Sequence, residues 1–285
     1  MKSRTLYISD LDGTLLNKNK EVSQFTKSVL NTFIDEGGNF SIATARTAAS
    51  ACKILSGLNI NTPIVLMNGA VIYDLCKNIY LKTEIIFRKT ARGIIEILKE
   101  NEISGFMYAI YRDKLVTYYE NLQDKPLRDF YDERVQKYYK SFEQVDNFID
   151  KITEDNIIYF TLIAEYDQLL TVHKIISENS DIDMSLYKDI YDENLWYLEI
   201  YSTHASKYNA VKYIREKYKF DKIIGFGDNH NDIPLLKACD EFYSVSNAIC
   251  ELKEKATGII GSNQSDGVSR FIEMNELGGR FSTIV

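Results

Sequence analysis

The feature that most constrains the fold is the alternation of strand-length apolar runs with helix-length segments in the N-terminal part of the chain. The apolar runs cover residues 6–8, 39–43 and 64–67. Helical spacing of apolar residues fills the interval from Ser23 to about Glu36, and a second helix is predicted over roughly 47–58. Strands separated by helices in this way pair in parallel, so the sequence predicts a parallel sheet.

Acidic residues follow the first of these strands at once. Asp10 and Asp12 come directly after the apolar run, and Gly13 marks a tight turn. An unpaired buried carboxylate is costly, and the carboxyl ends of the strands are where open α/β sheets bind ligands. We therefore expect these carboxylates to hold a divalent metal ion and to act on a phosphate.

A second acidic loop, nearer the C-terminus, has the same arrangement. The apolar run 223–226 ends in Gly227 and Asp228, and Asp232 follows in the same loop. Taken alone, this loop could be an ordinary turn that leads into an Asp-capped helix. Two such loops can supply the few oxygen ligands that Mg²⁺ takes from a protein, so we expect them to form one Mg²⁺ site.

From about residue 84 the pattern changes. Strand-like runs at 105–110 and 115–119 follow each other without a helix, which is typical of a mixed or antiparallel sheet. Strand–helix alternation returns near Leu195, with a strand predicted over 196–201. We therefore expect an inserted α/β domain over 84–190 and a core formed by 1–83 plus 191–285.

Composition excludes several classes of partner. The formal net charge is -7 and no long basic run is present, which argues against binding to nucleic acid. The four cysteines lack metal-binding or redox spacing, and no signal peptide or apolar stretch of membrane-spanning length is visible. The expectation is a cytoplasmic protein with no membrane partner, and the sequence indicates no oligomeric state.

A set of motifs resembles a known family. The motifs are ISDLDGTLL at 8–16, IATAR at 42–46, ASKYNAV at 205–211 and GFGDNHNDI at 225–233, with MNGA at 67–70 and SNA at 246–248. This set is similar to that of the haloacid dehalogenase superfamily of phosphatases, and more closely to its Cof-type group with a C2-type cap. The resemblance implies a Rossmann-like doubly wound α/β core with the insertion as a cap, and Mg²⁺ as cofactor.

The resemblance also implies roles for the matching residues. Asp10 would attack phosphorus as a nucleophile and form an aspartyl-phosphate. Asp10 and Asp228 would bind Mg²⁺ through their side chains, and Asp12 through its backbone carbonyl. The Asp12 side chain would then serve as general acid and base. Lys207 would neutralise the phosphoryl group, and Thr44 would hydrogen-bond one of its oxygens.

Other matched residues admit more than one role. Asp232 would order a metal-bound water or the catalytic lysine, and Asn231 would assist in the site. Asn68 either contacts the phosphate or only ends a strand, and Arg46 contacts the substrate or the closed cap. Ala45, in the same phosphate-binding loop, stands where the family commonly has Gly, which reduces the room around the phosphate.

Simpler explanations exist for single side chains. Thr44 could cap the helix that follows it, and Lys207 could be a solvated helix residue, although the helix dipole disfavours a cation at a helix start. Asn247 is expected to order a nearby loop without touching substrate. His230 is expected to be an ordinary loop residue and not a metal ligand.

The predicted function is Mg²⁺-dependent hydrolysis of a small phosphomonoester, such as a sugar phosphate or a similar metabolite. One alternative is a phosphomutase on the same fold, in which the phosphoryl group passes to substrate instead of to water. Another is a non-catalytic module that binds a phosphorylated ligand or regulates a partner. The complete set of catalytic groups argues against that module, because binding alone does not need both a nucleophile and an acid.

Overall fold

The computed structural model describes residues 4–138, 140–152, 156–188 and 195–281. The chain divides into two compact units, one formed by 1–82 with 206–285 and the other by 83–205. We call the first unit the core and the second the cap. The cap is thus an insertion between the two parts of the core.

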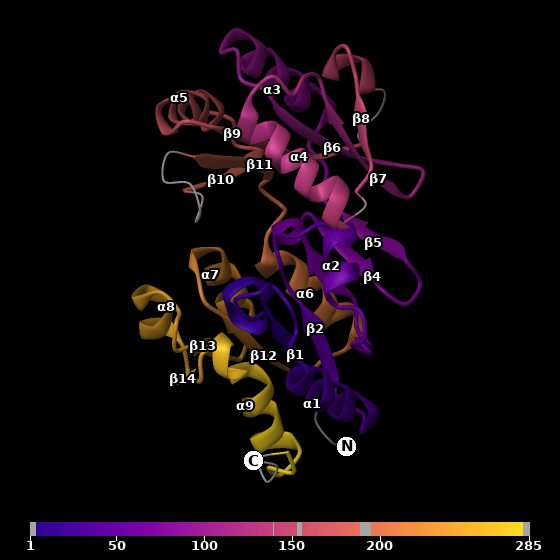
Figure 1. The fold of residues 1–285 in the computed structure, drawn as a ribbon, viewed down its shortest axis with the longest axis vertical. Coiled ribbons are helices and arrows are strands. Elements are labelled where there is room, and N and C mark those ends of the chain that lie inside the picture. Colours follow the sequence, from indigo (N-terminus) through magenta and orange to yellow (C-terminus); the bar gives the residue numbers. More distant parts are fainter. Residues whose placement is uncertain (1–3, 139, 153–155, 189–194, 282–285) are drawn as a thin grey trace. The chain divides into compact units, whose positions relative to one another are not determined.

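The core is built on a sheet of parallel strands, which confirms the predicted type of sheet. Its order is β14-β13-β12-β1-β2, and every neighbouring pair is parallel (Figure 1). The strands are β1 (Thr5–Ser9), β2 (Asn39–Ile42), β12 (Lys222–Gly227), β13 (Glu241–Val245) and β14 (Gly258–Ile260). Strands from the two ends of the chain, β1 and β12, therefore lie side by side in this sheet.

Helices cover both faces of the core sheet. Leu6, Tyr7 and Ile8 are all buried, and successive side chains of a strand point to opposite faces, so neither face of β1 is open to solvent. Ser23 accepts a hydrogen bond from the Thr26 amide at 3.0 Å, which confirms it as the cap of α1. The core helices are α1 (Gln24–Asp35), α2 (Ala48–Ile54), α6 (Lys207–Tyr218), α7 (Ile233–Ala238), α8 (Cys250–Lys255) and α9 (Gly267–Glu276).

The third predicted strand of the core keeps the expected parallel direction beside the second strand but forms its ladder in another sheet. It is antiparallel to the strand that follows it and belongs to a separate sheet with the order β3-β4-β5. A parallel bridge between Ala43 and Val65 links it to the end of β2. The tight turn after this strand, with Gly69 at a φ of +104°, allows the chain to reverse. The strands are β3 (Ile64–Leu66), β4 (Val71–Asp74) and β5 (Ile79–Thr83).

The cap has a mixed sheet of its own, as predicted. Its order is β10-β11-β9-β6-β7-β8, and all pairs are antiparallel except the parallel pair β7–β8. The strands are β6 (Gly105–Tyr111), β7 (Lys114–Tyr119), β8 (Phe142–Gln144), β9 (Ile157–Ala164), β10 (Ile182–Lys188) and β11 (Trp196–Ser202). The helices are α3 (Arg88–Glu100), α4 (Lys125–Tyr138) and α5 (Tyr166–Ile176).

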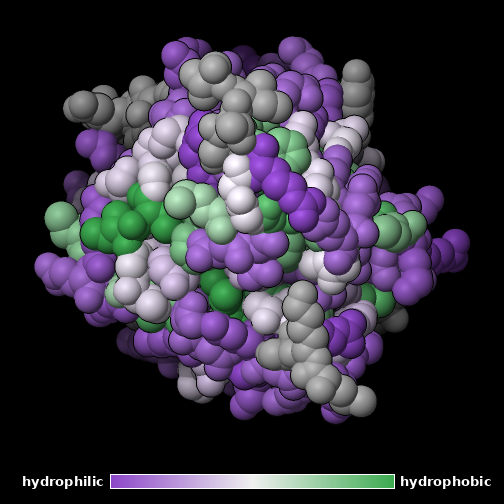
Figure 2. All heavy atoms as spheres, turned by 90° about the horizontal axis from the view of Figure 1, so that it is seen from below, coloured by the Kyte–Doolittle hydropathy of each residue, from purple (hydrophilic) through white to green (hydrophobic). Residues whose placement is uncertain are grey.

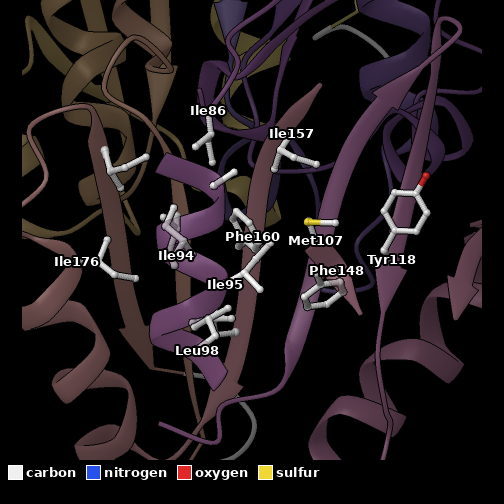
Figure 3. Close-up of a cluster of buried hydrophobic side chains, with 14 of the residues drawn as sticks. Ile86, Ile94, Ile95, Leu98, Met107, Tyr118, Phe148, Ile157, Phe160 and Ile176 are labelled. Carbon is white, nitrogen blue, oxygen red and sulfur yellow. The ribbon is translucent and has the colours of Figure 1, made fainter. Parts of the chain in front are cut away.

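A separate hydrophobic core stabilises the cap. Figure 3 shows Ile94, Ile95 and Leu98 of α3 in the same cluster as Met107 of β6 and Phe160 of β9. All five side chains are buried. Because apolar burial contributes roughly 25 cal/mol per Å², this cluster gives the cap a hydrophobic stabilisation of its own.

The cap extends further along the chain than predicted. The sequence assigns the strand at 196–201 to the core, but this strand is β11 and pairs with β9 and β10 in the cap sheet. The units accordingly divide after residue 205, and the predicted border between 190 and 191 lies outside the described residues. An alternating apolar strand suits either sheet, so its sequence pattern alone does not select its partners.

Hydrophilic residues predominate on the face of the molecule seen in Figure 2, where hydrophobic residues form small separate groups. Within the described ranges, no helix combines the length and the apolar character that crossing a bilayer requires.

Candidate active site

Backbone pairing continues one residue beyond β1 and places Asp10 at the edge of the core sheet. The Asp10 amide donates to the Phe226 carbonyl at 3.0 Å, and the Ala43 amide donates to the Ser9 carbonyl at 2.9 Å. Asp10 is buried between these neighbours. The loops after β1, β2 and β12 therefore begin side by side.

Lys207 is the central residue of the site. Its Nζ donates to Oδ1 of Asp10 at 2.7 Å and to Oδ1 of Asp232 at 2.6 Å, and its side chain is 1 % exposed. It is the first residue of α6, where the helix dipole disfavours a cation, and the two carboxylates outweigh that effect. The structure thus brings together three predicted site residues from separate parts of the chain.

Asp232 uses both carboxylate oxygens in contacts within the protein. While Oδ1 accepts from Lys207, Oδ2 accepts from the backbone amides of Asp228 and Asn229 at 2.9 and 3.2 Å. The residue is fully buried. Asp232 therefore fixes the position of the lysine and shapes the loop that carries Asp228.

The composition of the first acidic loop follows from its packing on Asp228. Gly13 has a φ of +80°, and a Cβ at this residue would lie 2.3 Å from Oδ2 of Asp228, so only glycine fits. Thr14 Oγ1 donates to Oδ1 of Asp228 at 3.0 Å. The glycine and the threonine that follow Asp12 thus bring the two acidic loops into contact.

Burial dominates the electrostatics of the site. It raises the pKa of Asp10 well above the usual value, although the Lys207 charge opposes it. Burial, followed by the charge of Asp232, raises the pKa of Asp228 to about 7. Burial alone would lower the pKa of Lys207, but the two carboxylates reverse that effect and raise it. A further positive charge at this position would favour the ionised acids.

Asp10, Asp228 and Asp232 form what we call the acid cluster. One carboxylate oxygen from each lies within 4.8 Å of the other two. When all groups are ionised, three carboxylates against one lysine leave two negative charges, which a divalent cation offsets. Carboxylate oxygens are the ligands that Mg²⁺ prefers, so the acid cluster fits this ion.

The Asp12 side chain lies outside the acid cluster and pairs with Arg46. Its Oδ2 accepts from Nε of the guanidinium at 2.7 Å and its Oδ1 from Nη2 at 2.6 Å. The Asp12 side chain is 49 % exposed and that of Arg46 is 16 % exposed. Bidentate pairs of this kind are strong and directional. The sequence did not reveal this contact, because the two residues lie in separate loops.

Thr44 and Asn68 are buried in two loops that are hydrogen-bonded to each other. The Asn68 amide donates to the Thr44 carbonyl at 3.1 Å, and Oγ1 of Thr44 accepts from the Arg46 amide at 3.2 Å. A Cβ on Gly69 would lie 2.2 Å from the carbonyl of Ser206. This close approach sets the loop against the start of α6, and Gly69 is a residue that our sequence analysis did not single out.

The remaining predicted residues lie at the edge of the site. Ala45 is partly buried in the loop between Thr44 and Arg46. Asn231 is exposed, and within the described part of the chain its side chain has no hydrogen-bond partner. His230 is exposed, with Nδ1 at 3.3 Å from Oε2 of Glu251.

Comparisons with known proteins give a family match and named relatives. The model of the haloacid dehalogenase-like hydrolase family matches residues 7–272. The chain is similar to the pyridoxal phosphate phosphatase YbhA of Escherichia coli (strain K12), with 24 % identity over 271 residues that cover 92 % of this chain and 95 % of that protein. It is also similar to the 5-amino-6-(5-phospho-D-ribitylamino)uracil phosphatase YitU of Bacillus subtilis (strain 168), with 22 % identity over 272 residues, 93 % of this chain and 94 % of that protein.

Solved structures share the fold. The structure of TM0651 from Thermotoga maritima has a TM-score of 0.78 and 24 % identity, and the match covers 96 % of this chain and 97 % of that one. The sugar phosphatase BT4131 of subclass IIB has a TM-score of 0.71 and 14 % identity, with 95 % and 98 % covered. These likenesses confirm the predicted α/β fold with its cap.

Proposed function

Because this chain belongs to the haloacid dehalogenase-like hydrolases, we propose that it is a Mg²⁺-dependent phosphatase that acts on a small phosphorylated metabolite through an aspartyl-phosphate. The observation that carries the proposal is the contact between Lys207 and Asp10 inside the buried acid cluster. Such a cluster is costly for stability, so a chemical use of its charges is the better explanation.

The proposed Mg²⁺ ligands are the side chains of Asp10 and Asp228 and the backbone carbonyl of Asp12. When bound, the ion offsets the negative charge of the acids and of the phosphate. The two unbalanced negative charges and the raised pKa of Asp228 support this assignment. We assign Asp232 to positioning, because its oxygens are already used by Lys207 and two amides.

In the first step, an oxygen of Asp10 bonds to phosphorus while the bond from phosphorus to the leaving oxygen breaks. Asp12 gives its proton to that oxygen, and Lys207 reduces the repulsion between the carboxylate and the phosphoryl group. The Thr44 hydroxyl donates to a phosphoryl oxygen. In the second step, Asp12 takes a proton from a water molecule that attacks phosphorus, which frees Asp10 and releases inorganic phosphate.

Arg46 would hold the Asp12 carboxylate in place between the two steps. With both oxygens hydrogen-bonded to the guanidinium, the Asp12 carboxylate is oriented for its role as base in the second step. In the first step, one of these hydrogen bonds must open so that Asp12 can deliver a proton to the leaving oxygen.

The proposed substrate is a sugar phosphate or a similarly small phosphomonoester. Two relatives of this chain are named as phosphatases of small phosphorylated metabolites, pyridoxal phosphate and a phosphoribitylamino-uracil. A structural neighbour is named as a sugar phosphatase. These names support the substrate class and do not select one compound.

A phosphate-release assay over a panel of phosphorylated metabolites, with Mg²⁺ or with EDTA, tests this proposal. We expect inorganic phosphate to appear only with Mg²⁺. Asp10→Asn should lower turnover roughly 10³-fold or more, with an unchanged circular dichroism spectrum. The matched control is Asp35→Asn, at an exposed acid in the last turn of α1, which should leave turnover unchanged. Phosphate release that survives EDTA or Asp10→Asn would overturn the mechanism, and phosphoryl transfer without free phosphate would identify a mutase.

A further inference from the structure

The turn Leu11–Leu15 carries Asp12. Asn247, which is not part of this turn, restrains it through its side chain. Its Nδ2 donates to the Gly13 carbonyl at 2.8 Å, and its Oδ1 accepts from the Asn263 amide at 3.0 Å. Gly13 directly follows Asp12, whose carbonyl is the proposed backbone ligand of Mg²⁺. Glycine has wide conformational freedom, so a hydrogen bond to its carbonyl restrains Gly13 and, through it, the Asp12 carbonyl one peptide earlier.

Asn263 extends the restraint to the end of the turn. Its Nδ2 donates to the Leu16 carbonyl at 2.8 Å. Within the turn, the Leu16 amide donates to the Leu11 carbonyl at 2.9 Å. Two side-chain amides from the C-terminal part of the chain therefore bind two carbonyls of the N-terminal loop.

The segment that carries Asn247 also holds the second acidic loop. The Ile249 amide donates to the Asp228 carbonyl at 2.9 Å. On the other side, Thr14 Oγ1 donates to the carboxylate of Asp228. The two loops are thus joined directly, through Thr14, and indirectly, through residues 247–249. The position of the Asp12 carbonyl relative to the Asp228 carboxylate depends on both connections.

We propose that Asn247, supported by Asn263, sets the affinity of the site for Mg²⁺ by fixing the Gly13–Thr14 peptide and, through Gly13, the orientation of the Asp12 carbonyl. This inference rests on the proposed function. Mg²⁺ requires near-ideal octahedral geometry with ligands at about 2.0–2.1 Å, so a small rotation of the Asp12 carbonyl weakens binding. Both asparagines are positioning residues, since each of their described side-chain contacts is to backbone.

The test compares Mg²⁺ binding by the full-length wild type, Asn247→Ala and Asn263→Ala. Binding is measured without substrate, from the rise in melting temperature as MgCl₂ is added. One hydrogen bond contributes about 1 kcal/mol, so we expect Asn247→Ala to raise the dissociation constant for Mg²⁺ about 3- to 10-fold, and Asn263→Ala to raise it less. Turnover of Asn247→Ala should recover toward the wild-type value at saturating Mg²⁺, which a general loss of structure would not allow.

Asn39→Ala is the matched control. Asn39 Nδ2 donates to the Thr5 carbonyl at 3.0 Å, so this variant removes the same kind of hydrogen bond at the opposite end of β1. Its affinity for Mg²⁺ should equal that of the wild type. If the wild type binds Mg²⁺ and both Asn247→Ala and Asn263→Ala bind it equally well, the inference is overturned while the proposed function stands. If the wild type neither binds Mg²⁺ nor needs it for turnover, both are overturned.

Discussion

Two buried lysines, one in each unit, show how different the surroundings of the same charge can be. Lys207 in the core is 1 % exposed and contacts two buried carboxylates, at 2.7 and 2.6 Å. Lys140 in the cap is 8 % exposed, and no carboxylate among the described residues pairs with it. Its Nζ lies instead over the rings of Tyr108 and Phe142, 4.2 and 4.8 Å from their centroids.

The surroundings decide the direction of each pKa shift. Burial disfavours the charged form of both lysines. At Lys207 the carboxylates outweigh burial and raise the pKa. At Lys140, burial and then the charge of Arg134 hold the pKa well below 10.5. Burial alone therefore does not mark a catalytic lysine. The convergence of acids on Lys207 supports its proposed role, and the lowered pKa of Lys140 indicates that its charge is unfavourable where it is buried.

The largest expected effect comes from removing the core lysine. Lys207→Met should lower kcat/KM for phosphomonoesters roughly 10³-fold or more, because the repulsion between Asp10 and the phosphoryl group is no longer offset. Lys140→Met makes the same chemical change in the cap and should leave the turnover of a small aryl phosphate within about two-fold of wild type, because its described contacts are with Tyr108 and Phe142 and not with the acid cluster. Equal losses in the two variants would contradict the distinction between the lysines.

Loss of one acid beside Lys207 should have the next largest effect, on stability. Asp232→Asn breaks a buried ion pair and should lower the free energy of unfolding by about 3 kcal/mol, measured by urea denaturation. The control is Glu36→Gln, which breaks an exposed pair with Arg280 and should cost less than about 1 kcal/mol. Similar losses in both variants would show that burial adds nothing to the pair with Lys207.

Removal of the cap lysine should have the opposite sign. Lys140→Met keeps the length of the side chain and removes a buried charge that no described carboxylate pairs with, so it should raise the free energy of unfolding by about 1–2 kcal/mol at neutral pH. Urea denaturation followed by tyrosine fluorescence measures the change. A loss of stability would mean that the contacts of Lys140 with the two rings outweigh the cost of burying its charge.

The smallest expected effect is the pH dependence of the stability that Lys140→Met gains. Because the pKa of Lys140 is lower in the folded chain than its ordinary value of 10.5, the folded state binds fewer protons between the two values, and wild-type stability rises with pH there. The advantage of Lys140→Met should therefore shrink as pH rises toward 10.5, as measured by urea denaturation at a series of pH values. The raised pKa of Lys207 keeps its contribution constant over this range, since such a contribution is lost only as pH passes the folded value. An advantage that grows with pH would contradict the lowered pKa of Lys140.

Local patterns were sufficient to predict most elements of the fold. The parallel core sheet follows from the spacing of strands and helices, and the start of α1 follows from Ser23. Pairing between distant strands was less predictable. β11 has the apolar pattern of a core strand, but it pairs in the cap sheet. β3 pairs antiparallel with β4, because the chain reverses direction between the two strands. The pattern of a strand specifies which of its faces is apolar. Its pairing partner depends on which strand lies beside it and forms backbone hydrogen bonds with it.

The sequence by itself determined which chemical groups lie at the ends of the strands. Asp10, Asp228 and Lys207 stand out because carboxylates after buried strands and a cation at a helix start are unfavourable without a partner. Only the tertiary structure decided which partners these residues have, and it also revealed the bidentate pair of Asp12 with Arg46. These contacts join separate loops at distances below 3 Å. Geometry of that kind depends on how the whole core packs, which no local pattern in the chain encodes.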